Sequence, residues 1–135
     1  MAEKNIVETV KVSLEQLIQK KLERDGKRNA EKDIYVKSLN ANLTVKNPSD
    51  TQRIAFADQT KTGSYVDMME AYTKLIYDCC PMLHSKELQE SIEVSYPYDT
   101  VKAIFDTEEI AEIGVKVLNF FDNEEENDSD EKLKN

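Results

Sequence analysis

The sequence of 135 residues is poor in glycine, histidine and long hydrophobic runs, and each shortage argues against a class of function. Three glycines leave no glycine-rich loop of the kind that holds phosphates. No apolar run approaches the roughly 18–20 residues that cross a bilayer, so we expect no membrane partner. The first residues lack the hydrophobic core of a signal peptide, so we expect a cytosolic protein whose two cysteines are reduced.

Acidic residues are in excess, with a formal net charge of −9, and many of them lie at one end of the chain. Residues 122–135 hold 7 acidic residues and 2 lysines, whereas the other 121 residues carry 20 acidic and 16 basic residues. The body is therefore only mildly acidic, and it has no basic stripe that could neutralise several phosphates. We expect no nucleic-acid partner, and we expect residues 122–135 to form a disordered acidic tail because they offer too little apolar surface for a core.

Hydrophobic periodicity predicts a mostly α fold, α+β at most: one small domain over residues 1–121 that forms a bundle of five to six helices. A chain of this length can bury a core without a disulfide or a metal. Capping pairs predict three helix starts, at Ser13 with Gln16, at Ser49 with Gln52 and at Asp106 with Glu109. Single caps predict three more, at Ser64, Ser85 and Asp99.

Turn-forming residues predict where these elements end. The first helix is expected over about residues 14–24, with Leu14, Leu17, Ile18 and Leu22 on one face, and should stop near Gly26. Ile54, together with Ala57 or Asp58, should define the faces of the second helix. The strand-favouring segments 34–36 and 43–45 flank an Asn-Ala-Asn turn, which predicts a short hairpin near the N-terminus.

The segment "YTKLIYDCCPMLHSKELQ", residues 72–89, contains both cysteines and the single histidine, and it is the one place where a metal or thiol site could be built. Adjacent helical residues point about 100° apart, so Cys79 and Cys80 cannot face one metal without a break in the helix. A structural zinc site also needs four ligands at a wider spacing. Thiol catalysis by Cys80 with His84 is disfavoured because a helix C-terminus opposes a thiolate. We expect core cysteines, no metal, no cofactor and no enzyme activity.

The strongest helical pattern lies between Gly63 and Pro81, and it carries a methionine-rich apolar stripe. Methionine is adaptable and suits a surface that binds variable partners, although such a stripe is more often core. Phe120 and Phe121, at the end of the last helix, are open to the same two interpretations. The candidate partner-binding residues are Met68, Met69, Tyr72, Met82, Phe120 and Phe121. Gly114 lies on the last apolar stripe, where a missing side chain allows another backbone to approach or is merely tolerated.

Residues 72–122 resemble the XkdN-like tail assembly chaperones of phages and prophages of Gram-positive bacteria. The similarity covers roughly residues 33–122 and is clearest in its second half. It consists of a helix that ends in Leu75-Ile76-Tyr77-Asp78-Cys79, then Pro81, then Lys86-Glu87-Leu88-Gln89, a helix start at Pro97–Val101, and Glu109-Ile110-Ala111-Glu112-Ile113 before Val117-Leu118. The chain departs from the pattern at Phe120 and Phe121, where a glycine is expected nearby, and in its longer N-terminal lead.

This resemblance implies a non-enzymatic protein of the host cytoplasm that is left out of the mature virion. Such chaperones coat the tape measure protein, keep it soluble and help to recruit subunits of the major tail tube protein, and they can form homo-oligomers on the client. An alternative hypothesis from the net charge is an acidic phage adaptor or inhibitor that binds a basic host protein. A third, from "CCPMLH", is a metalloenzyme or zinc module. The acidic tail could keep a complex soluble, or could simply be a solvated end.

Overall fold

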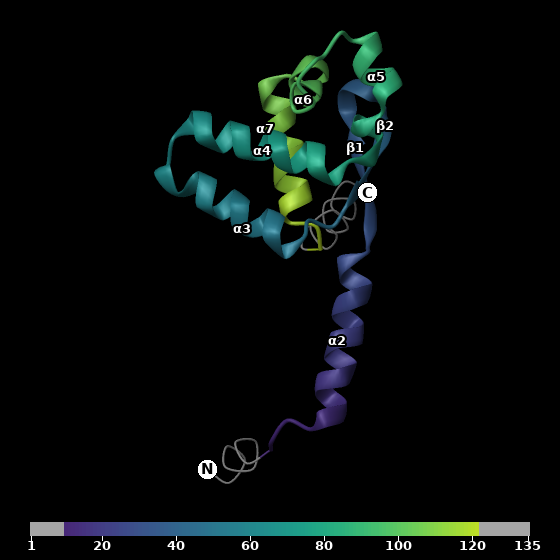
Figure 1. The fold of residues 1–135 in the computed structure, drawn as a ribbon, viewed down its shortest axis with the longest axis vertical. Coiled ribbons are helices and arrows are strands. Elements are labelled where there is room, and N and C mark those ends of the chain that lie inside the picture. The colour runs from purple at the N-terminus through teal and green to yellow at the C-terminus, as the bar shows by residue number, and fades with distance from the viewer. Residues whose placement is uncertain (1–9, 122–135) are drawn as a thin grey trace, which may run out of the picture.

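The structure is a computed structural model, and it describes residues 10–121. Six α-helices, one two-stranded antiparallel sheet and three short 3₁₀ turns follow one another in this part of the chain (Figure 1). The mostly helical fold with a hairpin near the N-terminus is therefore confirmed. The predicted acidic tail lies outside the described residues. The elements are α2 (Leu14–Arg28), β1 (Glu31–Val36), η1 (Lys37–Leu39), β2 (Ala41–Lys46), α3 (Asp50–Gln59), η2 (Thr60–Thr62), α4 (Tyr65–Cys79), η3 (Pro81–His84), α5 (Lys86–Ser91), α6 (Asp99–Ile104) and α7 (Thr107–Leu118).

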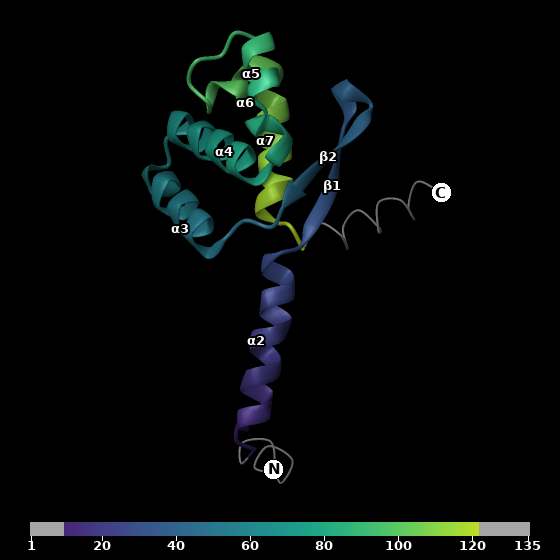
Figure 2. The ribbon, with the colours of Figure 1, turned by 45° about the vertical axis from the view of Figure 1, so that its right-hand side comes forward.

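Helix α2 projects from the rest of the molecule as an arm (Figures 1 and 2). Its start is the predicted capping box, in which Ser13 Oγ accepts from Gln16 N and Gln16 Oε1 accepts from Ser13 N. The predicted end was wrong, because the helix continues past Gly26 to Arg28. No atom lies within 4 Å of a Cβ placed on Gly26, so this glycine interrupts neither packing nor the helix.

The hairpin packs one face against the helices. Ile34 and Val36 of β1 alternate with exposed residues, as Leu43 and Val45 of β2 do, and these four side chains are buried. The register pairs Ile34 with Leu43. The turn was expected at Asn40-Ala41-Asn42 but consists of η1 and Asn40, residues 37–40, so only Asn40 is shared. Asn40 adopts the left-handed conformation with φ 49°, which asparagine tolerates well.

Helix α3 begins with the predicted capping box of Ser49 and Gln52, but it turns a different face to the core than expected. Ile54 is 68% exposed. Phe56 is half-buried instead and packs on Tyr72 of α4, with ring centroids 5.1 Å apart. Ile54 was a weak guide because Phe56, two residues further on, points to nearly the opposite side of the helix, and the sequence does not decide which of the two faces the core.

Helices α4 and α7 cross at Gly114, where a glycine is required. A Cβ on Gly114 would lie 2.3 Å from Cδ1 and 2.9 Å from Cβ of Tyr72. The group that approaches Gly114 is thus the aromatic side chain of Tyr72, whereas the sequence had suggested the approach of another backbone. Around this crossing the core contains Val45, Ile76, Val101, Val117 and Phe120, each at most 1% exposed.

The remaining helices are short and connect α4 to α7. Ser85 caps α5 as predicted, by accepting from Leu88 N. The predicted cap of α6 was wrong: Asp99 is its first residue, and Tyr98 stands at the cap position without a side-chain cap bond. The Tyr98 hydroxyl instead donates to Asp78 Oδ1 at 3.0 Å, which ties the start of α6 to α4.

Candidate partner-binding surfaces

A groove of about 480 Å³ lies between the first turns of α4 and the junction of α6 with α7. Tyr65 and Val66 stand at its edge, each 65% exposed, while Phe105 and Ile110 line it as buried residues, each 4% exposed. Its other lining residues are Met69, Glu70, Thr73, Lys102, Asp106 and Thr107. An apolar floor with charged residues at the rim is suited to the apolar face of a partner helix. We call it the α4 groove.

Only one of the six predicted partner-binding residues lines the α4 groove. Met69 is half-buried there, and Met68 beside it on α4 is also half-buried. Tyr72, one turn further along, points to α7 and covers Gly114. Met69 and Tyr72 thus pack against the core, Met69 also lines the groove, and a role of this stripe in binding stays a prediction.

The other three predicted residues lie elsewhere. Met82 in η3 is 72% exposed. Phe120 is 1% exposed and belongs to the core, whereas Phe121 is 37% exposed and contacts the Phe120 ring edge-on at 4.9 Å. The structure does not bring Met82, Phe121 and Met69 together into one surface, and their roles in binding stay predictions.

The cysteines and the histidine are structural. Cys79 and Cys80 are at most 1% exposed, and burial raises the pKa of the Cys79 thiol to about 12 and also raises the pKa of Cys80. The Cys79 thiol donates to Gln52 Oε1 at 3.5 Å. His84 stacks on Tyr77 and donates from Nε2 to the Tyr77 carbonyl at 2.7 Å. Within residues 10–121 no group of His, Cys, Asp or Glu could hold a metal ion.

Helix α2 carries a second apolar surface, which we call the arm face: Leu14, Leu17, Ile18 and Leu22. These side chains are between 53% and 70% exposed, and no residue of α2 is buried. The sequence predicted this amphipathic helix but not that it stands alone. One signal could have shown it: seven of the nine residues from 20 to 28 are charged, and such a segment cannot enter a core.

The arm is basic on an otherwise acidic chain. Residues 14–28 contain five basic and three acidic residues, whereas residues 29–135 contain 11 basic and 22 acidic residues. At 3.6 residues per turn, Lys20 and Arg24 fall along one border of the arm face, whereas Lys21 lies within the face and pairs with Asp25 at 2.6 Å. The arm therefore offers an apolar row beside a row of positive charge.

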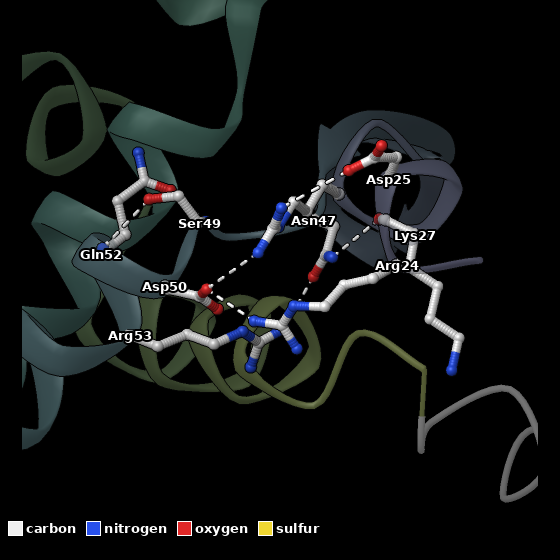
Figure 3. A network of polar contacts seen from close by, with 9 residues as sticks. Arg24, Asp25, Lys27, Asn47, Ser49, Asp50, Gln52 and Arg53 are labelled. Atoms are coloured by element: carbon white, nitrogen blue, oxygen red, sulfur yellow. Dashed lines mark hydrogen bonds and ion pairs between the residues drawn. The ribbon is translucent and has the colours of Figure 1, made fainter. Parts of the chain in front are cut away.

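A network of polar contacts joins the arm to the body (Figure 3). Arg24 Nη2 lies 2.6 Å from Asp50 Oδ2 at the start of α3, and Asn47 Nδ2 donates to the Lys27 carbonyl at 2.8 Å. Arg53 then donates to Asn47 Oδ1 and to the Leu118 carbonyl, both at 2.7 Å. These contacts connect the last turns of α2 to α3 and α7, so they give the arm a defined direction.

A second groove, of about 300 Å³, lies between the turn of the hairpin and the first half of α7. We call it the hairpin groove. Tyr35, 53% exposed, lines it, and Leu39, 51% exposed, is nearby in η1. Ser38 donates a hydrogen bond to Glu109 across it. Four acidic residues and two lysines also line it: Asp106, Glu108, Glu109, Glu112, Lys37 and Lys116. The acids at the start of α7 are stabilised by its dipole, and they give this groove a negative rim.

Comparisons with known proteins identify the family of this chain. In the part of the chain that the structure describes, no helix is long and apolar enough to cross a membrane. No curated protein and no solved structure matches the chain significantly. A family model described as the phage XkdN-like tail assembly chaperone protein matches residues 28–134, which is most of the sequence. The chain therefore belongs to the family of XkdN-like phage tail assembly chaperones.

Proposed function

We propose that this protein is a non-enzymatic chaperone that coats the tape measure protein of its phage in the host cytoplasm and helps to recruit tail tube subunits around it. The family supplies the general role in tail assembly. The proposal goes further in naming the client and the way in which it is held. It also places the protein among assembly factors that are absent from the finished virion.

The α4 groove is the observation that carries this proposal. A long helical client presents a repeating apolar face, and a chaperone that covers it needs an apolar groove with a polar rim. Tyr65 and Val66 extend the groove onto the open surface, and Met69 gives it an adaptable wall. The alternative of an acidic adaptor for a basic host protein has less support, because the groove has an apolar floor that the exposed Tyr65 and Val66 extend to its edge.

Co-expression with the tape measure protein of the same phage, followed by size-exclusion chromatography and intact mass measurement, tests the proposal. We expect a soluble complex with several copies of the chaperone on each client. Val66→Lys should weaken this complex by placing a charge in the α4 groove. Ile54→Lys is the matched control, because Ile54 on α3 is 68% exposed, close to the 65% of Val66, and does not line the groove.

Two outcomes would contradict the proposal. If the client precipitates while the chaperone elutes alone, the tape measure protein is not its client. If Val66→Lys and Ile54→Lys weaken the complex equally, the α4 groove is not where the client binds.

A further inference from the structure

The arm face needs a cover that the described chain does not provide. An isolated helix of 15 residues is only marginally stable in water, and α2 has that length and no buried residue. Its capping box and its contacts with Asp50 and Asn47 help to hold it, yet four large apolar side chains remain in solvent. A row of this kind on one helix face is typical of a docking surface.

We propose that the arm of one copy docks into the hairpin groove of a second copy, so that the protein assembles head to tail. Charge complementarity identifies this occupant. The arm has an excess of two positive charges, and the hairpin groove is lined by four acidic residues and two lysines. Lys20, and Lys21 in exchange for its ion pair with Asp25, would lie near Glu108 and Glu112, which are exposed on α7, while the arm face covers Tyr35 and Leu39. Pairing of two arms would instead bring two positively charged helices together.

The positions of the arm and the hairpin groove prevent a copy from binding its own arm. In both views α2 leaves the body at one end, whereas the turn of the hairpin and α6 lie toward the other end (Figures 1 and 2). The hairpin itself follows α2 along the chain, with β1 starting at Glu31, and runs away from the arm to its turn at η1. A copy therefore cannot fill its own groove with its own arm. Two different surfaces that meet in this way join copies head to tail, into a closed ring or an open filament.

This inference goes beyond the proposed function and does not depend on it. The arm occupies residues 14–28, almost entirely before the segment 28–134 that matches the family model. The α4 groove has a different lining and shares only Asp106 with the hairpin groove. Copies joined by their arms therefore keep the Tyr65 and Val66 edge of the α4 groove open for another partner.

Sedimentation velocity of the purified full chain alone, at low salt and over micromolar concentrations, tests the proposal. We expect larger species as the concentration rises, and their loss at high salt. An arm variant, Lys20→Glu with Lys21→Glu, and a groove variant, Glu108→Lys with Glu112→Lys, should each raise the concentration for half-assembly roughly tenfold or more. The control is Lys61→Glu with Lys86→Glu, which makes the same charge change as the arm variant away from both surfaces.

Mixing the two variants provides the decisive measurement. In each variant alone the arm and the groove carry charge of the same sign, whereas in the mixture the arm of either variant is opposite in charge to the groove of the other, so mixing should restore assembly with the two variants alternating. Leu17→Gln with Leu22→Gln should also weaken assembly, while far-UV circular dichroism verifies that the body is folded. A chain that stays monomeric at every concentration would overturn the proposal. So would variants that assemble like the control, or arm variants that lose only binding to the tape measure protein.

Discussion

Helices α2 and α4 are the same length, 15 residues, and both begin with a serine cap and carry an apolar row, yet they have opposite surroundings. Helix α4 buries five residues, Ala71, Thr73, Leu75, Ile76 and Cys79, whereas α2 buries none. Local sequence rules thus explain why each segment is helical, since caps and periodicity depend on neighbours along the chain. They do not determine what covers the apolar row, which is set by residues far away in sequence or by another molecule.

A matched pair of isoleucines should give the largest contrast between body and arm. Ile76 is fully buried and Ile18 is 53% exposed. We expect Ile76→Ala to lower the free energy of unfolding by about 2–5 kcal/mol, because it leaves a cavity in the core. Ile18→Ala should change it by less than about 0.5 kcal/mol, as exposed substitutions usually do. Urea denaturation of the two variants, at concentrations where the protein is monomeric, measures both. Equal losses would mean that the arm packs against the body in solution.

Thiol reactivity provides a second contrast between body and arm, because both native cysteines lie in the body. We expect a thiol reagent at pH 8 to leave Cys79 and Cys80 unmodified in the folded protein, since both are buried and have raised pKa values. A cysteine placed in the arm by Leu17→Cys should react at the rate of an unfolded peptide. Modification of Cys79 in the native protein as fast as that of the arm cysteine would show that the end of α4 opens readily.

The pKa of Cys79 also predicts a dependence of stability on pH. The thiol ionises near 9 when exposed and near 12 in the fold, so between these values the folded state binds more protons than the unfolded state. The contribution of Cys79 is fully present below pH 9 and is lost as the pH rises toward 12. We expect the free energy of unfolding to fall by up to about 1.4 kcal/mol per pH unit in this range. Cys79→Ala should show a shallower alkaline decline, which the difference between the two denaturation series measures.

The same substitution, glycine to alanine, should change stability in opposite directions at Gly114 and Gly26. Gly114→Ala places a Cβ 2.3 Å from the Tyr72 ring, which must shift, and we expect a loss of about 1–3 kcal/mol. Gly26→Ala meets no atom within 4 Å and should strengthen α2 by up to about 1 kcal/mol. Thermal unfolding measures the first effect, and the helical signal in circular dichroism measures the second. A neutral Gly114→Ala would show that α4 and α7 have room to separate.

The parts of this fold that the sequence predicts are those governed by short-range contacts. The capping boxes at Ser13, Ser49 and Asp106 need only a partner three residues away, and all three are present. The end of α2 was mispredicted because Gly26 is a helix breaker only by propensity, a preference of about 1 kcal/mol that neighbouring residues overcame. The hairpin turn was predicted at residues 40–42 but lies at residues 37–40, because asparagine is equally acceptable at several turn positions.

The grooves proposed as binding surfaces depend on long-range contacts, and the sequence indicated few of the residues that line them. Met69 was a candidate, but the exposed Tyr65 and Val66 beside it and the floor of Phe105 and Ile110 come together only when α4 packs against α6 and α7. Phe120, at the end of the last helix, was a candidate for contact with a partner, yet it is buried in the core. A periodic pattern shows that a face is apolar, and tertiary packing decides whether it is covered.

The smallest effect on stability is expected where arm and body meet. The hydrogen bond from Arg24 lowers the pKa of Asp50, so the favourable contact is present above the ordinary value of 3.8 and is lost as the pH falls through the lowered pKa. Because the pair is exposed, Asp50→Asn should barely change global unfolding, but it should widen the range of arm directions. Spin labels at Gln19→Cys and Lys61→Cys measure that range as a distance distribution. Acidification and high salt should broaden the wild-type distribution in the same way. A distribution unchanged by all three treatments would mean that Asn47 and Arg53 alone fix the arm, and that the ion pair is incidental.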